Sequence, residues 1–298
     1  MRNSVLLVLF VAGCTTGPAI PPPPAGLTPP VQTILDASPA ADWRPLDPQN
    51  TLYMDFPQGR VIIEMAPAFA PNHVANLKAL SREGYFVNGA VTRVQDNFVA
   101  QWAQAADPER LPMVGQKTLK AEFFIGQDTG GRFTRLPDRD TYATEVGFID
   151  GMPVARDATT QWIAHCYGVV GVGRENSEDS GGGTELYAII GQSPRNLDRQ
   201  LSVLGRVVQG MEILSALPRG TGDAGFYKTA DEYAHYADIK LAADLPAAQQ
   251  TRLEVLRTDS ATFADIVNNR RWRKDDFYSN PVGRIGLCNI VVPSRVVK

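Results

Sequence analysis

The apolar residues of this chain come in short runs, and run length limits the folds open to it more than any other feature. Runs of about four to eight apolar residues bounded by turn formers are typical of strands. Short runs of this kind, each bounded by glycine or polar clusters, surround Val91, Val99, Val169, Ala188 and Val203. Few segments have helical spacing, so the pattern predicts a mainly β protein, built as a closed antiparallel barrel.

An antiparallel hairpin is predicted where the strand pattern begins. Residues 52–56 and 60–65 are rich in strand formers, and residues 57–59 between them (Pro-Gln-Gly) supply a turn. Residues 72–84 follow with apolar side chains at helical spacing.

The first residues form a predicted export signal. Arg2 supplies a positive charge, and residues 5–12 are apolar but too few to cross a membrane. The stretch ends in Val-Ala-Gly-Cys at residues 11–14, which resembles a bacterial lipobox. This resemblance implies that residues 1–13 are a signal peptide and that Cys14 carries a lipid. Thr15 favours the periplasmic face of the outer membrane.

An ordinary secretory signal with an incidental cysteine is the alternative, and both interpretations place the mature protein outside the cytoplasm. Residues 14–45 are predicted to be a proline-rich tether, because proline lacks an N–H group and fixes φ. Such a segment favours extended polyproline II and acts as a semi-rigid spacer. A brief helix is predicted at residues 31–36. No later apolar run approaches the roughly 20 residues that a bilayer-spanning helix needs.

The composition excludes some classes of function. Hydrophobic residues make up 44% of the chain, which is enough for an ordinary globular core. The net charge is −3 and would be −4 without a leader whose only charge is Arg2, so no nucleic-acid partner is predicted.

The three histidines lack metal-ligand spacing, and residues 174–183 lack the spaced ligands of an EF-hand and favour a flexible loop. We expect no metal.

Five blocks in order resemble the cyclophilin-type peptidyl-prolyl cis–trans isomerases. They are the hairpin with residues 70–80, then residues 84–101, 168–172, 183–189 and 204–211, and residues 238–241 are a candidate closing strand. The resemblance covers about residues 50–245. It implies a closed antiparallel eight-stranded cyclophilin-like barrel capped by two helices, in a domain of residues 46–245.

The resemblance implies a reaction that needs no cofactor, metal or nucleophile. Rotation about an X–Pro bond faces a barrier of roughly 18–20 kcal/mol because it breaks amide resonance. In the twisted state the prolyl nitrogen gains a lone pair, and a fixed guanidinium aimed at it lowers the barrier. Arg93 matches the family's catalytic arginine, and Gln101 matches the glutamine that binds the substrate backbone and steadies the arginine. The alternative for Arg93 is a surface salt bridge.

An apolar pocket for the proline ring is implied beside Arg93. Its predicted substrate-binding residues are Phe98, Val99, Glu185, Tyr187, Leu197 and Leu201. For Val99 and Leu197 the alternative is plain barrel core. His165, near the groove strand, is expected to be a packed and hydrogen-bonded side chain.

Several residues usual in the family are replaced, at Thr92, Trp102, Glu185 and Tyr187. Asn196 stands where the family has a tryptophan associated with cyclosporin binding, and Leu201 replaces a histidine. We therefore expect weak cyclosporin binding, measurable as isomerase activity that persists at nanomolar inhibitor, and an altered substrate preference.

Two regions extend beyond the family pattern. Residues from about 103 to 162 are predicted to be a long polar loop insertion, which either shapes the groove entrance, contacts a partner or is a surface excursion. Residues 246–298 are predicted to be a C-terminal extension packed on the barrel, with helices at 246–257 and 261–269 and a strand at 285–292. Cys166 and Cys288 are the cysteines left after Cys14, and in an oxidising compartment they are candidates for a disulfide.

The leading functional hypothesis is an isomerase that acts on X–Pro bonds of exported proteins. A non-catalytic cyclophilin-like module or chaperone that binds proline-containing peptides is the alternative. A third hypothesis is a surface-anchored interaction protein that uses the insertion and the extension. The predicted partners are proline-containing polypeptides and, through the N-terminal lipid, a membrane; we expect a monomer.

Overall fold

The computed structural model describes residues 26–107 and 109–297. The predicted signal peptide 1–13 and the predicted lipidation site Cys14 lie outside these residues. No helix among the described residues combines the length and the apolar character that a bilayer crossing requires.

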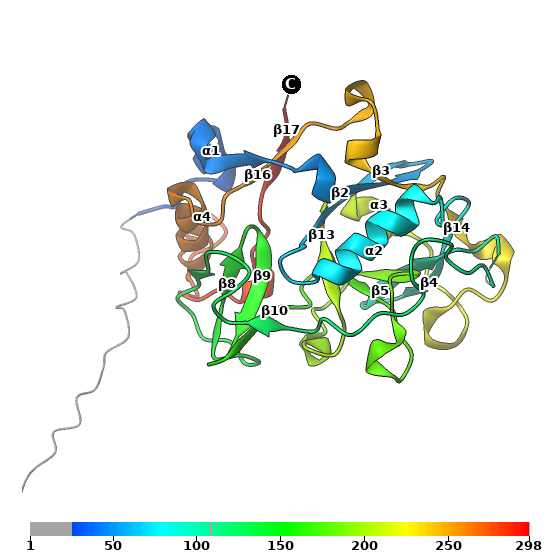
Figure 1. Ribbon diagram of the computed structural model, residues 1–298. Coiled ribbons are helices and arrows are strands. Elements are labelled where there is room, and N and C mark those ends of the chain that lie inside the picture. The colour runs from blue at the N-terminus through cyan, green and yellow to red at the C-terminus, as the bar shows by residue number, and fades with distance from the viewer. Residues whose placement is uncertain (1–25, 108, 298) are drawn as a thin grey trace, which may run out of the picture.

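The main sheet is antiparallel throughout and curls on itself (Figure 1). Its strands, in spatial order, are β14 (Ala234–His235), β4 (Ala90–Gln95), β5 (Val99–Ala103), β12 (Glu185–Ile189), β11 (Val169–Val172), β13 (Val203–Gln209), β3 (Gly59–Met65), β2 (Thr51–Phe56) and β15 (Ile239–Leu241). The predicted hairpin is confirmed as β2 and β3, and each of the five predicted apolar runs lies in or at the end of one of these strands.

The inner face of the curled sheet encloses the first apolar core. Alternate side chains of a strand point to the same face, so each strand contributes every second residue. Two helices pack on this core, α2 (Pro71–Arg82) and α3 (Met211–Ala216). The fully buried members include Leu52, Met54, Val61, Ile63, Leu77, Leu80, Val91, Ala100, Trp102 and Leu214. The helix predicted at residues 72–84 is therefore confirmed as α2.

The insertion is not a plain polar loop, and that prediction was wrong. It contains a five-stranded antiparallel sheet in the order β6 (Ile125–Gly126), β10 (Thr160–Ile163), β9 (Met152–Arg156), β8 (Glu145–Ile149) and β7 (Thr134–Arg135). Phe148, Val154 and Trp162 of this sheet are buried. The longest of these strands has only 5 residues, which is too short for a clear apolar period.

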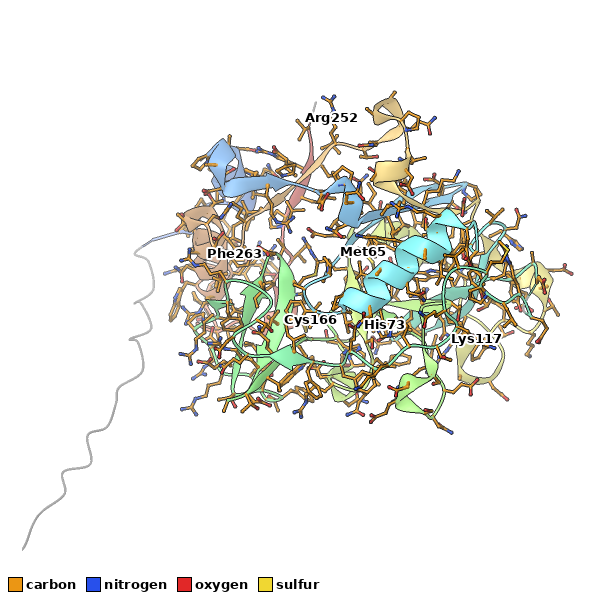
Figure 2. The ribbon with its side chains drawn as sticks, in the orientation of Figure 1. Met65, His73, Lys117, Cys166, Arg252 and Phe263 are labelled. Carbon is orange, nitrogen blue, oxygen red and sulfur yellow. A yellow bond between two sulfur atoms is a disulfide. The ribbon has the colours of Figure 1, made fainter. Side chains whose placement is uncertain are left out.

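A second apolar core joins the insertion to the outer face of the main sheet and to the C-terminal extension. It includes Phe148 from β8, Val99 from β5 and Phe263 from α4 (Ala261–Arg271). The rings of Phe148 and Phe263 meet edge to face, with centroids 5.2 Å apart. Figure 2 labels Phe263 beside the insertion strands. The extension is thus packed on the barrel domain through a core that it shares with the insertion.

Two predicted elements of the extension were wrong. The helix predicted at 246–257 is instead strand β16 (Leu253–Leu256), which pairs with β1 (Trp43–Pro45) and β17 (Ser294–Val296). The i, i+3 spacing of Leu253 and Leu256 fits a helix, but a three-stranded sheet lets Val255 be buried as well. The strand predicted at 285–292 is a 3-10 turn at Leu287–Asn289. The helix predicted at 261–269 is confirmed as α4, with the Ser260 hydroxyl accepting from Phe263 N–H.

The N-terminal segment joins the folded protein earlier than the predicted tether boundary at residue 45. Thr28 N–H donates to the Lys274 carbonyl at 2.8 Å, and α1 (Val31–Asp36) packs against α4. Trp43 in β1 is only 6% exposed. Burial of this large ring and the strand pairing of β1 hold residues 28–45 against the extension. The brief helix predicted at 31–36 is confirmed as α1.

Cys166 and Cys288 form a disulfide, with Cα atoms 4.9 Å apart. The bond links the segment before β11 to the 3-10 turn of the extension. Short 3-10 turns complete the connections at Ala40–Asp42, Pro48–Asn50, Glu178–Ser180, Arg195–Leu197, Asp223–Gly225, Ala230–Glu232, Ala242–Asp244, Ala247–Gln249 and Leu287–Asn289.

Candidate active site

The β4–β5 hairpin places Arg93 directly opposite Gln101. The two residues are register partners, and the register shifts between Val91 and Arg93 as in a β-bulge. A bulge re-aims the side chains that follow it. Val91 and Val94 are fully buried in the inner core, while Arg93 and Gln101 are only partly buried. The two predicted catalytic side chains therefore lie together beside the outer face of the sheet.

Three acceptors hold the Arg93 guanidinium. Its Nε donates to the Ala224 carbonyl at 2.7 Å, its Nη1 donates to Gln101 Oε1 at 3.1 Å, and its Nη2 donates to Gln95 Oε1 at 2.5 Å. The rings of Phe98 and Phe226 flank it, with centroids 5.6 Å and 5.1 Å from the guanidinium carbon. Burial lowers the pKa of Arg93 from its ordinary value, although an arginine keeps its charge in a protein.

Gln101 connects Arg93 to Glu185. Its Oε1 accepts from Arg93, and its Nε2 donates to Glu185 Oε2 at 2.8 Å. The three side chains come from β4, β5 and β12, which are adjacent strands of the main sheet. This row of polar contacts orients the Gln101 amide, because its oxygen faces the cation and its nitrogen faces the carboxylate.

The predicted apolar pocket residues gather on the outer face of the sheet, with one exception. Val99 and Tyr187 belong to the second core, and the half-buried Phe98 and Leu201 pack against it. Leu197 is half-buried on the 3-10 turn Arg195–Leu197 and is not a member of this cluster. Its place in the pocket stays a prediction.

The hydroxyl of Tyr187 points into the interior of the protein. The residue is 5% exposed, and its hydroxyl lies 2.9 Å from Nε2 of the fully buried His165. The two rings are nearly parallel, with an interplanar angle of 10°. Burial raises the pKa of Tyr187 well above its ordinary value, so the hydroxyl keeps its proton. The expectation of a packed, hydrogen-bonded His165 is confirmed.

Sequence reasoning missed the loop after α3. Ala224 and Phe226 approach Arg93 from this loop, and Phe226 forms an isolated bridge with Arg93. Gly225 has φ +78°, and a Cβ there would lie 2.6 Å from the Cα of Gln95. The glycines in residues 220–225 were the available signal for a tight turn, but they did not indicate which strand the turn would contact.

A cavity between the N-terminal segment and the insertion lies away from this site. This cavity of about 320 Å³ is lined by residues such as Arg44, Glu64 and Phe69 and by none of the predicted site residues. Among the described residues, no group of three His, Cys, Asp or Glu side chains is placed to hold a metal ion. The loop at 174–183, predicted to be flexible, contacts the insertion through Asp179, whose carboxylate accepts from Ala121 N–H at 2.7 Å.

A curled, mainly β sheet that carries a held arginine beside an apolar cluster is the arrangement expected of a cyclophilin. Residues 51–237 match the family described as "Cyclophilin type peptidyl-prolyl cis-trans isomerase/CLD". The chain therefore belongs to the cyclophilin-type peptidyl-prolyl cis–trans isomerase family, which is a family of enzymes.

Similar proteins agree with this assignment. Two relatives, from Brucella suis biovar 1 and Brucella melitensis biotype 1, are each 27% identical over 188 residues, covering 62% of this chain and 81% of the relative. Each is named a "probable peptidyl-prolyl cis-trans isomerase". The crystal structure of cyclophilin AquaCyp293 from Hirschia baltica has a TM-score of 0.68 and 26% identity, over 85% of this chain and 93% of that chain. This structural likeness extends beyond residues 51–237.

Proposed function

We propose that this chain accelerates cis–trans isomerisation of X–Pro bonds in exported polypeptides, with Arg93 stabilising the twisted prolyl amide. The observation that carries the proposal is the held guanidinium of Arg93 beside the apolar cluster of Phe98, Val99, Tyr187 and Leu201. A guanidinium that is already oriented needs no reorganisation when the prolyl nitrogen becomes pyramidal, so its stabilisation is selective for the transition state.

The donor count supports a substrate-facing role for Arg93. A guanidinium has five N–H donors. The described part of the chain provides three acceptors for it, in Ala224, Gln101 and Gln95. Two N–H groups, one on each terminal nitrogen, are left for the prolyl nitrogen or the neighbouring carbonyl. Gln101 is held on both sides in the same way and can offer its second N–H to the substrate backbone.

Isomerisation of a short Ala-Pro peptide tests the proposal. We expect Arg93→Ala to lower kcat/KM about 10²–10³-fold, the usual effect of removing one oriented transition-state donor. Arg219→Ala is the matched control, because Arg219 is in the same loop region but pairs with the exposed Asp96 instead. Circular dichroism shows whether each variant keeps its fold.

The same measurement decides between the enzyme and the binding module. A wild-type chain that binds the peptide but is no faster than solvent would replace the enzyme by a module that only recognises proline. An Arg93→Ala variant with wild-type kcat/KM would remove Arg93 from the mechanism and leave isomerisation to other residues.

We also propose that the chain is exported and anchored by a lipid on Cys14, at the periplasmic face of an outer membrane. The lipobox-like residues 11–14 and the proline-rich residues that follow support this localisation. In a Gram-negative host we expect the mature chain to begin at Cys14 and to gain the mass of a diacylglyceryl group and a fatty acyl chain. Cys14→Ser should release the chain from the membrane fraction. An unmodified mature N-terminus elsewhere would contradict lipidation.

A closed eight-stranded barrel is the finer fold that we infer. The two ends of the main sheet, β14 and β15, are separated by only three residues, and Tyr236 and Ala237 continue the hydrogen bonding to Gly89 and Asp55. If β14 and β15 are counted as one bent strand, this segment pairs with β4 on one side and β2 on the other. The barrel then has no free edge, which removes a site of aggregation.

A further inference from the structure

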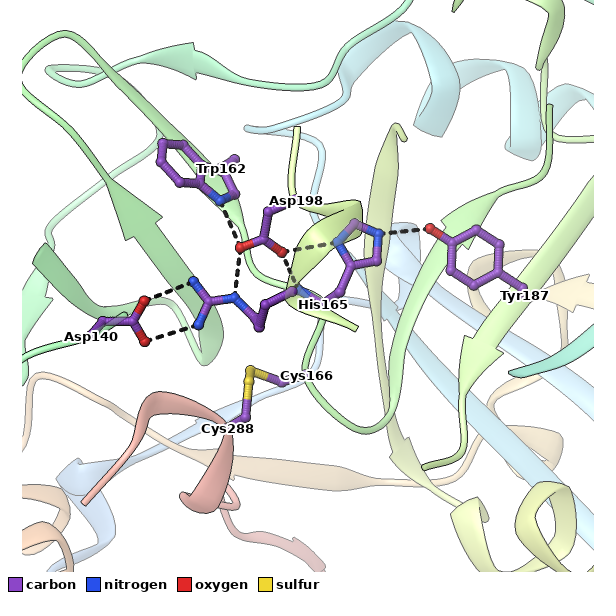
Figure 3. A network of polar contacts seen from close by, with 8 residues as sticks. Asp140, Trp162, His165, Cys166, Tyr187, Asp198 and Cys288 are labelled. Atoms are coloured by element: carbon purple, nitrogen blue, oxygen red, sulfur yellow. Dashed lines mark hydrogen bonds and ion pairs between the residues drawn. A yellow bond between two sulfur atoms is a disulfide. The ribbon is translucent and has the colours of Figure 1, made fainter. Parts of the chain in front are cut away.

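A buried chain of polar contacts runs from the insertion to Tyr187 (Figure 3). Asp140, in the loop between β7 and β8, forms a double ion pair with Arg195 at 3.0 and 3.1 Å. Arg195 Nε donates to Asp198 at 2.6 Å. Asp198 contacts His165 Nδ1 at 3.2 Å, and His165 Nε2 meets the Tyr187 hydroxyl at 2.9 Å. Each residue is therefore bonded to the next, and we call this series the relay: Asp140, Arg195, Asp198, His165 and Tyr187.

Asp198 is the centre of the relay. One of its oxygens also accepts the backbone N–H of His165 at 2.9 Å, and the other accepts the indole N–H of Trp162 at 3.0 Å. Burial alone would raise the pKa of Asp198, but hydrogen bonds from His165 and the charge of Arg195 outweigh it and hold the pKa below its ordinary value. Asp198 is therefore ionised at neutral pH and acts only as an acceptor.

Because Asp198 is an acceptor, it determines which group donates in the hydrogen bonds between Asp198, His165 and Tyr187. Nδ1 of His165 must carry the proton that faces the carboxylate, which leaves Nε2 as an acceptor in the neutral imidazole. The Tyr187 hydroxyl then donates to Nε2. The phenol ring cannot move freely, because its oxygen also lies against Gly171, where a Cβ would overlap it.

The relay provides a hydrogen-bond partner for Tyr187, which stands where the family pattern has a phenylalanine. A phenylalanine ring needs no polar partner when buried, but a buried hydroxyl without one loses free energy. Without His165 as acceptor, the Tyr187 hydroxyl would be left unpaired in the interior, and the ring would have to shift for it to reach another partner. The apolar cluster beside Arg93 would then change shape.

We propose that His165, Asp198, Arg195 and Asp140 are positioning residues for Tyr187, through which the insertion sets the shape and hence the substrate preference of the proline pocket. This inference rests on the proposed function of the groove. Two charged residues of the relay are buried, with Arg195 7% exposed and Asp198 9% exposed, and Asp140 is half-buried. Asp140 and Trp162 come from the insertion, whereas Tyr187 comes from the main sheet. The insertion is thus a structural part of the pocket and not a surface excursion.

A double-mutant cycle on the full chain tests the link between His165 and Tyr187. The probe is a short Ala-Pro peptide, with its Kd from NMR titration and its kcat/KM from the isomerisation assay. We expect His165→Leu to raise Kd roughly tenfold, the value of one buried hydroxyl left without its acceptor. We expect Tyr187→Phe to change Kd less than about threefold, because the ring remains and no hydroxyl needs a partner.

The double variant His165→Leu/Tyr187→Phe separates positioning from folding. We expect it to recover the Kd of Tyr187→Phe, since the phenylalanine ring no longer depends on His165. A double variant as weak as His165→Leu, or a His165→Leu variant with wild-type Kd, would overturn the proposal. A purely structural histidine would lower the melting temperature in both backgrounds without this recovery of binding.

A change at the far end of the relay tests the role of the insertion without touching the core. We expect Asp140→Asn to raise Kd for the peptide about threefold and to shift the ¹⁵N resonances of the His165 ring. Glu145→Gln is the matched control, because Glu145 pairs with Arg135 and Arg156 in the same small sheet and has no contact with the relay. Equal effects of the two variants would reject the link to the insertion.

Failure of this inference and failure of the proposed function give different results. If the chain is not an isomerase, the wild type is no faster than solvent, and the double-mutant cycle is evaluated from the Kd values alone. If the chain is an isomerase but the relay is only structural, Arg93→Ala collapses kcat/KM while the His165 and Asp140 variants keep wild-type Kd.

Discussion

Arg93 is held by residues that come from two separate parts of the sequence. Gln95 and Gln101 belong to the same hairpin as Arg93, but Ala224 and Phe226 come from a loop more than a hundred positions later. Phe226 is 43% exposed, so core packing does not require it. Its ring lies against the guanidinium, with its centroid 5.1 Å from the guanidinium carbon.

Replacing Phe226 by alanine should therefore affect catalysis more than stability. We expect Phe226→Ala to lower kcat/KM about threefold to tenfold, because a cation–π contact is worth about 0.5–2 kcal/mol. The melting temperature should stay within about 2 °C of wild type, as is usual for exposed side chains. Phe277→Ala is the control, since Phe277 is 83% exposed and has no contact with Arg93. Equal activities for all three proteins would show that Phe226 does not support Arg93.

At the scale of elements, the loop after α3 hydrogen-bonds to β4 along part of that strand. Gly220 N–H donates to the Val94 carbonyl at 2.9 Å, and Tyr227 N–H donates to the Thr92 carbonyl at 3.1 Å. Between these two bonds the chain bends tightly, with Ala224 at φ +51° and Gly225 at φ +78°. This bend points the Ala224 carbonyl at Arg93.

A side chain at position 225 should loosen that bend. In Gly225→Ala the new Cβ would meet the backbone of Gln95 at 2.6 Å, and alanine disfavours a positive φ. We expect the loop to shift away from β4 and kcat/KM to fall roughly tenfold to a hundredfold, the value of one hydrogen bond to a charged group. Gly126→Ala in the insertion is the control, because its Cβ would meet nothing closer than 3.9 Å. Wild-type activity in Gly225→Ala would argue against a role for the loop in holding Arg93.

At the scale of the whole molecule, four stretches of the chain meet in the second core. They are the N-terminal segment with Trp43, the insertion with Phe148, the outer face of the main sheet with Tyr187, and the extension with Phe263. The predicted pocket residues Val99 and Tyr187 are part of this core, so their packing depends on the N-terminal segment, the insertion and the extension. Figure 1 shows α1 and α4 together at one end of the molecule and β4 and β5 toward the other. The end of the molecule that carries α1 is therefore away from β4, the strand that carries Arg93.

The disulfide between Cys166 and Cys288 should stabilise this assembly. It spans a sequence separation of 122 residues, and closing a loop of that length in the unfolded chain is worth up to about 5 kcal/mol. We expect a reducing agent to lower the melting temperature of the wild-type chain by several degrees. The double variant Cys166→Ser/Cys288→Ser should melt at the reduced temperature with or without reductant. A wild-type chain that melts identically in both conditions would mean that the bond adds no stability.

The sequence alone was sufficient to predict the hairpin, the strands around Val91, Val99, Val169, Ala188 and Val203, and helices α1, α2 and α4. From the sequence, Cys166 and Cys288 were only candidates for a disulfide, and the structure shows the bond. The sequence was also sufficient for the family, because the blocks around Arg93 and Tyr187 keep their order. These features depend on residues that are close in the chain or on a pattern that survives in local blocks. Hydrophobic period and turn chemistry are properties of such local stretches.

Only the tertiary structure decided the rest. The short strands of the insertion, the strand at Leu253–Leu256 and the folded residues 28–45 all gain their stability from partners distant in sequence. The same is true of Ala224 beside Arg93 and of Asp140 at the end of the relay to Tyr187. A hydrogen bond or an apolar contact depends on positions in space, and the distance between two residues along the chain does not determine those positions. For that reason the sequence indicated which residues could do the chemistry, and the fold determined what holds them in place.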